Sequence, residues 1–152
     1  MILFKDNTFR LDTTDTTYMF RITKFGHLEH VYYGASLDSE DLAEVLAQKR
    51  TAVIGNSVDY DESDKYYNLD NMCLEWSDNG RGDYRQSPTE LKMPDGSFIS
   101  DFIYNSHDIK NESVPIKGLP SAYDGDQTLV ITLKDIAFNV NITLYYTVFE
   151  KA

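Results

Sequence analysis

The segment NGRGDYRQSP, residues 79–88, concentrates charged side chains whose types could do chemistry. Arg81, Asp83 and Arg85 lie close together and follow the only tryptophan, Trp76. Arginine and aspartate side chains suit the vicinal hydroxyls of a sugar, and an aromatic ring can stack on a sugar's apolar face. The same segment could instead form a plain turn, with its glycines at positive φ and its arginines paired to local acids. Both interpretations stay open on these residues alone.

The other chemistry-bearing residues do not suggest a catalytic constellation. The acidic run VDYDESDK at residues 58–65 lacks the glycine and the bidentate glutamate of an EF-hand calcium loop. His27 and His30 are expected on opposite faces of one strand, where they cannot share a metal ion. Cys73, the only cysteine, is predicted to be a buried small hydrophobe rather than a nucleophile. We therefore expect no metal, no cofactor and no catalytic residue in this chain.

Composition limits the partners and the compartment. The 152 residues fit one domain, and the formal net charge is −11. Such a surface repels phosphate backbones and anionic lipids, which argues against nucleic-acid and membrane-surface partners. No apolar run reaches the ~20 residues of a membrane span, and the first residues do not resemble a secretory signal. One cysteine allows no internal disulfide, so we expect a cytoplasmic protein.

The elements that must position these residues are predicted to be strands. Residues 18–22 and 28–33 alternate apolar and polar side chains and flank a tight turn ending at Gly26, which indicates a hairpin. Residues 138–148 give the clearest strand, because every second residue is apolar. Residues 129–133 form another strand before it.

The middle of the chain follows other patterns. Acids in a first turn after Asp38 or Ser39, and basic residues up to Arg50, predict one helix. Residues 51–86 are acidic, aromatic and weakly periodic, and so long a loop is usually functional or mobile. Residues 97–105 are predicted to form a further strand. The sequence as a whole predicts an all-β protein, a large antiparallel β-sandwich with one short helix and a long loop.

Five blocks of sequence, in order, resemble the start of the family 36 α-galactosidases. They are TYMFRITKFGHLEHVYYG (17–34), YNLDNMCLEWSDNGRGDYRQSP (67–88), PDGSFISDFIYNSHDIKNESVPIKGLPSAY (94–123), QTLVITLKD (127–135) and VNITLYYTVFE (140–150). The resemblance spans nearly the whole chain. It implies the N-terminal β-sandwich domain of a retaining glycosidase that removes terminal α-linked galactose from melibiose and raffinose-type oligosaccharides.

The same resemblance implies that the chemistry lies elsewhere. Family members continue with a (β/α)8 barrel, which carries both catalytic aspartates, and a small C-terminal β domain. A retaining mechanism needs its two carboxylates about 5 Å apart, so residues 1–152 alone are expected to be inactive. The last strand also runs to the end of the chain without a closing turn, from which we expect a piece of a longer protein.

The resemblance further implies a role for the long loop. Bacterial relatives are typically tetramers in which this loop, here within residues 51–76, reaches the active site of a neighbouring subunit. Lys65 stands where relatives often carry arginine, and Trp76 where they often carry tyrosine. Residues 51–55 depart from an acid-containing pattern of some relatives. The implied substrate-pocket residues are Lys65, Asp70 and Trp76.

Arg81, Asp83 and Arg85 are then expected to form a positioning cluster, which orders the loop and packs the domain against the barrel. The implied partners are the chain's own barrel, further copies of the protein and a galactoside. An alternative from another class is a free-standing carbohydrate-binding β-sandwich module, which would need an exposed aromatic platform.

Overall fold

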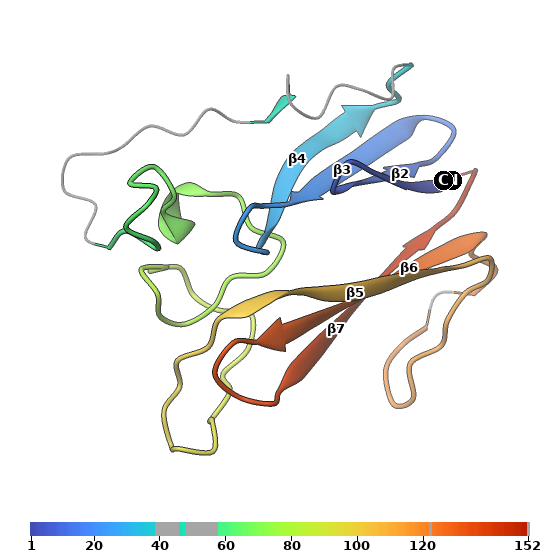
Figure 1. Cartoon of the computed structure of the whole chain (residues 1–152). Helices are drawn as coiled ribbons and strands as arrows, with labels where there is room; N and C mark the ends of the chain where they lie inside the picture. Colours follow the sequence, from blue (N-terminus) through green and yellow to red (C-terminus); the bar gives the residue numbers. More distant parts are fainter. Residues whose placement is uncertain (39–45, 48–57, 122, 152) are drawn as a thin grey trace.

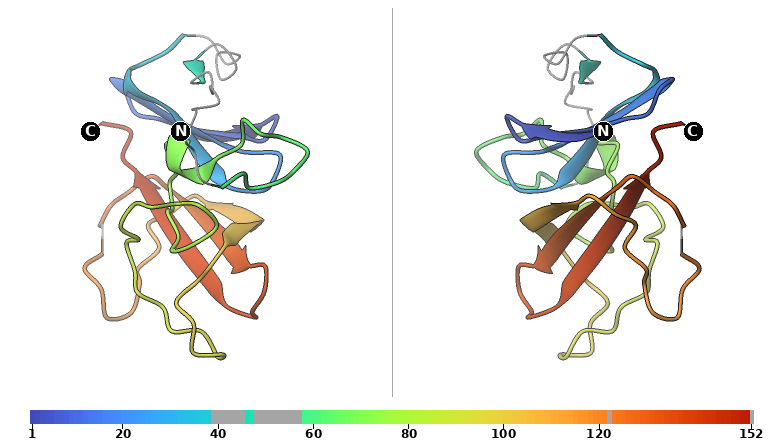
Figure 2. Two further views of the ribbon diagram at one scale, coloured as in Figure 1. Left: turned by 90° about the vertical axis from the view of Figure 1, so that its left-hand side faces the viewer. Right: turned by 90° about the vertical axis from the view of Figure 1, so that its right-hand side faces the viewer.

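The computed structural model describes residues 1–38, 46–47, 58–121 and 123–151, and it consists mainly of two antiparallel sheets (Figure 1). The first sheet contains, in spatial order, β1 (Ile2–Lys5), β2 (Thr8–Asp12), β3 (Thr16–Ile22) and β4 (Leu28–Ala35). The second contains β5 (Phe102–Lys110), β6 (Gln127–Asp135) and β7 (Asn141–Val148). The two sheets form separate layers in both side views (Figure 2). The predicted antiparallel β-sandwich is confirmed.

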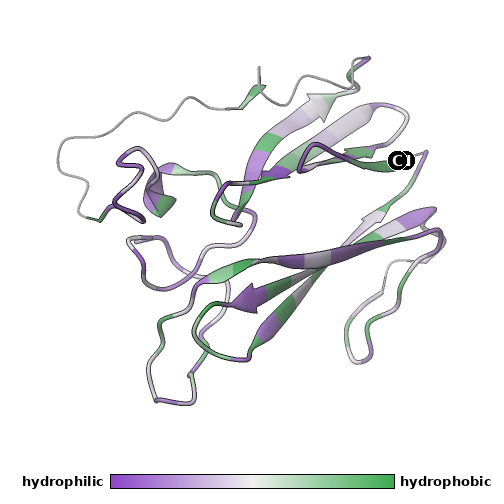
Figure 3. Ribbon diagram, in the orientation of Figure 1, coloured by the Kyte–Doolittle hydropathy of each residue, from purple (hydrophilic) through white to green (hydrophobic). Residues whose placement is uncertain are grey.

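The core is made by alternate residues of facing strands. Phe9 and Phe20 from the first sheet and Leu129 and Ile131 from the second are completely buried. Burying each such side chain stabilises the fold by about 1.5–3 kcal/mol. Hydropathy changes along the strands (Figure 3), as expected for strands with one face toward a core. The apolar face predicted for residues 138–148 packs against this core and is confirmed. The predicted strand starts too early, however, because β7 begins at Asn141 and residues 136–140 form the turn after β6.

The sequence patterns did not predict the β1–β2 hairpin. Its two-residue turn is Asp6-Asn7, with φ angles of 48° and 59°. Positive φ at both positions is the geometry of a type I′ turn, which matches the twist of the flanking strands. Asp and Asn adopt this conformation more readily than other non-glycine residues. The signal was present in the sequence, but it is weaker than the usual Asn-Gly pair.

The strand predicted at residues 97–105 begins later than expected, at Phe102. Residues before it bond to other segments: the Ser100 amide donates to the Asn79 carbonyl at 3.0 Å, and the Asp101 amide to Asp135 Oδ2 at 2.9 Å. The prediction was therefore wrong at its start and missed the strand's extension to Lys110. Ser100 is thus held by the long loop and Asp101 by a side chain at the end of β6, and neither amide bonds to a backbone carbonyl of the sheet.

Cys73 is exposed, so the prediction of a buried thiol was wrong. The segment around it is extended, and Leu74 forms an antiparallel bridge with Glu29 of β4. Alternate side chains of an extended segment point to opposite sides. Met72 is accordingly buried while Cys73 faces outward.

The described part of the long loop, residues 58–86, is irregular but packed. It contains one short 3-10 helix, η1 (Leu69–Asn71). Tyr67, Leu69 and Met72 form a second small core, against which Phe25 of the β3–β4 turn packs. The predicted helix that would precede this loop lies almost wholly outside the described residues. Within the described part of the chain, no helix is long and apolar enough to cross a membrane.

Candidate functional site

Asp83 and Arg85 form a fork that fixes the interior of the loop. Arg85 Nε and Nη2 donate to the two carboxylate oxygens of Asp83 at 2.9 and 2.8 Å. The same guanidinium donates to the carbonyls of Leu69 and Met72, at 2.7 Å to Leu69. The Asp83 side chain is completely buried, whereas that of Arg85 is 37% exposed. One arginine thus ties the last part of the loop to η1 and to the residue that follows η1.

The backbone around this fork turns sharply. Gly80 and Gly82 have φ angles of 111° and 85°, and Arg81 between them has 53°. The Asp83 amide closes the turn by donating to the Gly80 carbonyl at 3.0 Å. The turn interpretation of this segment is therefore confirmed, including the pairing of Arg85 with a local acid. Because the Asp83 carboxylate is buried and occupied, it serves the loop and does not face solvent.

Arg81 pairs with a more distant acid. Its Nε lies 3.2 Å from Oδ2 of Asp101, and its guanidinium carbon lies 4.6 Å from the centre of the Tyr60 ring. Tyr60 also donates its hydroxyl to Asp101 Oδ2 at 2.9 Å. Burial, and next the charge of Asp101, raise the pKa of Tyr60 to about 12. The start and end of the described loop therefore meet on one carboxylate oxygen.

The other oxygen of Asp101 accepts a hydrogen bond from a histidine. His27 Nε2 donates to Asp101 Oδ1 at 2.9 Å, and both side chains are buried. His27 Nδ1 lies 2.8 Å from the hydroxyl of Tyr67, which belongs to the second core of the loop. His30 lies near a different acid, Glu75. The two histidines thus occupy separate sites.

The predicted substrate-pocket residues are not gathered in one place. Lys65 is exposed, and its carbonyl accepts a bond from Asn68 Nδ2 at 3.1 Å. Asp70 is half-buried within η1. Trp76 packs against the main core and donates its Nε1 to Asp78 Oδ1 at 3.0 Å. Among the described contacts, none joins Trp76 to the other two residues.

A third buried carboxylate, which the sequence did not reveal, joins the two sheets. Glu75 accepts hydrogen bonds from Tyr18 of β3 at 2.6 Å and from Tyr146 of β7 at 2.9 Å. Burial raises the pKa of Tyr18 and of Tyr146 far above the usual tyrosine value, and Glu75 adds to both shifts. Only the position of Glu75 between apolar Leu74 and Trp76 could have indicated a buried acid.

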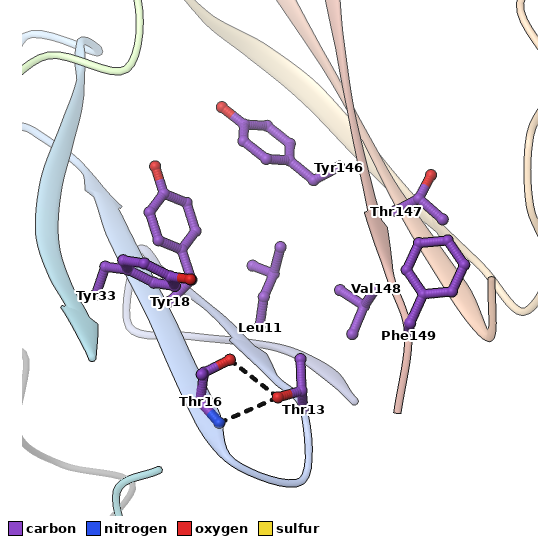
Figure 4. A pocket seen from close by; sticks show the side chains of 9 residues that line it. All are labelled: Leu11, Thr13, Thr16, Tyr18, Tyr33, Tyr146, Thr147, Val148 and Phe149. Carbon is purple, nitrogen blue, oxygen red and sulfur yellow. Dashed lines mark hydrogen bonds between the residues drawn. The ribbon is translucent and has the colours of Figure 1, made fainter. Parts of the chain in front are cut away.

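An open cavity of about 350 Å³ lies beside these tyrosines, between the sheets (Figure 4). Its wall is largely aromatic and aliphatic, with Tyr33 and Phe149 among its lining residues. The hydroxyls of Tyr18 and Tyr146 are already bonded to Glu75, and that of Thr13 to Thr16 at 2.9 Å. These hydroxyls are therefore already engaged by bonds within the protein.

Comparison with known proteins places this geometry in context. A family model described as the glycosyl hydrolase family 36 N-terminal domain matches residues 26–152. The chain is 32% identical, over 146 residues, to the bifunctional alpha-galactosidase/sucrose kinase AgaSK of Mediterraneibacter gnavus, covering 94% of this chain and 15% of that protein. It is 29% identical, over 147 residues, to the alpha-galactosidase AgaA of Geobacillus stearothermophilus, covering 94% and 20%.

Solved structures give the same result. The galactosidase domain of AgaSK matches with a TM-score of 0.90 and 29% identity, covering 99% of this chain and 21% of that one. An AgaA variant in complex with raffinose matches with a TM-score of 0.85 and 28% identity, covering 95% and 20%. The chain thus spans about a fifth or less of the length of these relatives.

Proposed function

The chain belongs to the glycosyl hydrolase family 36 N-terminal domains, and from this premise we propose that it is the non-catalytic N-terminal domain of a retaining α-galactosidase. Its catalytic aspartates lie in a (β/α)8 barrel that follows, with a small β domain after it. The substrates are terminal α-galactosides, and the enzyme is a cytoplasmic homotetramer. The domain contributes to assembly, and its loop rims the substrate pocket of a neighbouring subunit.

The observation that carries the loop's role is its construction. The Arg85–Asp83 fork and the bonds to Asp101 fix its interior and its two ends, while the Lys65 side chain stays exposed. A fixed backbone that presents an exposed polar side chain loses little conformational entropy on binding. This is the arrangement expected of a segment that must reach a pocket outside its own domain.

Each predicted loop residue has a chemical task in this proposal. The Lys65 ammonium supplies three hydrogen-bond donors to sugar hydroxyls, and the Asp70 carboxylate supplies acceptors. Trp76, which lies within the loop, offers its indole ring, although this ring also makes a perpendicular contact with the Phe102 ring. The positioning cluster orders the loop and packs the domain against the barrel; for Arg85 and Asp83 the loop-ordering part is supported by the fork.

The proposal is tested first by activity. Release of nitrophenol from p-nitrophenyl α-galactoside is compared between this 152-residue chain and the full reading frame that encodes it. We expect activity in the longer protein alone, with circular dichroism confirming that the shorter chain is folded. Activity in neither protein would contradict the assignment, and activity in the shorter chain would contradict its non-catalytic role.

The contact between subunits has its own test. Subunits with the Lys65→Met loop and an intact barrel are mixed and reassembled with subunits that carry an intact loop and a barrel lacking its nucleophilic aspartate. If the loop acts on a neighbour, the mixed oligomers recover a lower KM than the Lys65→Met homo-oligomer. A KM that does not change on mixing would mean that the loop does not act between subunits.

The alternative of a free-standing carbohydrate-binding module has one observation in its favour. Tyr66 and Tyr84, both near the loop's fixed core, are 57% and 68% exposed, and exposed aromatic rings can stack on sugars. Titration calorimetry of melibiose against the 152-residue chain distinguishes the two functions. Binding without the barrel supports the module, and no binding supports the enzyme domain.

A further inference from the structure

We infer that Asp101 is a positioning residue that clasps the two ends of loop segment 60–81 and thereby sets where Lys65 and Asp70 lie. Its kinetic consequence rests on the proposed function, in which this loop contacts the substrate. Asp101 itself is 4% exposed and lies just before β5, outside the loop. It is therefore a fixed point of the sandwich to which the loop is attached.

The clasp is formed by three donors from separate segments. Asp101 Oδ2 receives the Tyr60 hydroxyl at 2.9 Å and lies 3.2 Å from Arg81 Nε, so one oxygen joins both ends of the segment. Asp101 Oδ1 receives His27 Nε2 at 2.9 Å. Hydrogen bonds to a charged group are roughly twice as strong as neutral ones. The bond between the buried His27 and Asp101 is also shielded from competition with water, whereas the Arg81 side chain is 43% exposed and solvent weakens its ion pair.

The two ends of the segment also contact one another. The Arg81 guanidinium carbon lies 4.6 Å from the centre of the Tyr60 ring, which is within range of a cation–π interaction. His27 extends the clasp inward, because its Nδ1 lies 2.8 Å from the Tyr67 hydroxyl in the middle of the loop. The Asp101 carboxylate thus bonds directly to the start and the end of the segment, and through His27 to its middle.

The second sheet and its turn hold Asp101 in place. Its amide donates to Oδ2 of Asp135 at the end of β6, at 2.9 Å. The other oxygen of Asp135 receives the amides of Ala137 and Phe138 at 2.9 and 2.6 Å, which fixes the β6–β7 turn. Since His27 belongs to the first sheet's β3–β4 turn, Asp101 attaches the loop at the junction of both sheets. In Figure 1 the green loop lies beside the β3–β4 turn.

The decisive variant is Tyr60→Phe in the full-length enzyme, because it removes one donor to Asp101 and keeps the ring. Hydrogen exchange is followed in peptides covering residues 60–72 and, as an internal reference, in β6. Loss of a hydrogen bond to a charged group should speed exchange in residues 60–72 by roughly tenfold or more, with β6 unchanged. Tyr123→Phe, at a tyrosine that is 80% exposed, is the matched control.

Asp101→Asn is the second variant, since it removes the charge but keeps an acceptor oxygen. It should also speed hydrogen exchange in residues 60–72, and by more than Tyr60→Phe does. Its control is Asp108→Asn, because the Asp108 side chain is 59% exposed. In both loop variants we expect KM for p-nitrophenyl α-galactoside to rise several-fold with kcat unchanged. A residue with only a general structural role would not separate KM from kcat in this way.

The outcomes separate the clasp from the proposed function. Faster exchange in residues 60–72 together with a raised KM supports both. Faster exchange with an unchanged KM supports the clasp and rejects contact between the loop and the substrate. Unchanged exchange in Tyr60→Phe, or equal acceleration in residues 60–72 and in β6, overturns the clasp. If Asp101→Asn does not fold, Tyr60→Phe alone decides.

Discussion

Single residues in this domain act mainly by tying irregular backbone to buried acids, and Arg85 is the clearest case. We predict that Arg85→Met destabilises the chain by about 2–3 kcal/mol, because it leaves the buried Asp83 carboxylate with only the Arg85 backbone amide as donor and deprives the Leu69 and Met72 carbonyls of the guanidinium. This loss of stability is smaller than for a fully buried ion pair, because the Arg85 side chain is 37% exposed. Urea denaturation measures the loss.

Arg85→Lys is the matched control for this prediction. It keeps the charge but not the planar fork, which reaches Asp83 and the Leu69 carbonyl together. We expect only partial recovery of stability. Equal stability of Arg85→Met and the wild type would show that the fork does not stabilise the loop.

Tyr60 predicts a dependence on alkaline pH. Its pKa is raised from 10.0 to about 12, first by burial and then by Asp101. A raised pKa means that the folded state favours the neutral phenol, so its contribution to stability is complete below pH 10 and is lost as pH rises through about 12. Subtracting the tyrosinate absorbance titration of Tyr60→Phe from that of the wild type should leave one step near pH 12. A step near pH 10, as for an exposed tyrosine, would contradict the buried clasp.

At the scale of elements, the β3–β4 turn is joined to the second sheet by a direct backbone hydrogen bond. Gly26 has a φ of 92°, and its carbonyl accepts the Tyr104 amide of β5 at 2.7 Å. A Cβ at this position would lie 3.0 Å from Ile103 Cβ. Gly26→Ala should therefore be destabilising both through its backbone conformation and through this contact.

Gly96→Ala separates the two causes. Gly96 has a φ of 85°, but a Cβ added there would meet no heavy atom of the described residues within 4 Å, so its substitution measures backbone strain alone. That strain should cost about 1–3 kcal/mol, and Gly26→Ala should cost about 1–3 kcal/mol more. Thermal unfolding of the two variants gives the difference. An equal loss of stability in both variants would show that the contact between the new Cβ and Ile103 costs no stability.

The strands were predictable where one face repeats without interruption. Residues 18–22 and 138–148 carry the period-2 pattern because their apolar residues fill the core between the sheets. The boundary at residues 97–105 was not predictable, because side-chain and backbone bonds from distant segments decide where β5 begins. The Asp6-Asn7 turn carried a usable local signal, which its lack of glycine weakens.

The candidate site was less predictable than the fold. Arg85 and Asp83 are neighbours in sequence, so their pairing follows from local chemistry. Asp101 and His27 meet across sheets from opposite halves of the chain, and no spacing rule gives that contact. The same is true of Glu75, whose two tyrosine donors come from β3 and β7. Long-range polar contacts follow from the fold rather than from any motif.

At the scale of the whole molecule, two buried carboxylates stand where the sheets meet. Glu75 joins the sheets through Tyr18 and Tyr146, and Asp101 joins them through His27 and its amide bond to Asp135. Glu75 lies within the long loop, and Asp101 bonds to Tyr60 and Arg81 of the same loop. The sandwich therefore provides a rigid base, and the loop is the part that the proposed enzyme would direct at a substrate.

The most direct test of this account is the kinetics of raffinose hydrolysis by the full-length enzyme with Lys65→Met. Losing one polar contact to the substrate should lower kcat/KM by roughly 5- to 150-fold, or about 1–3 kcal/mol, mostly through KM. Lys92→Met, which removes an exposed lysine of another loop, should match the wild type. The same kinetics for Lys65→Met and the wild type would contradict the claim that this domain's loop takes part in the substrate pocket.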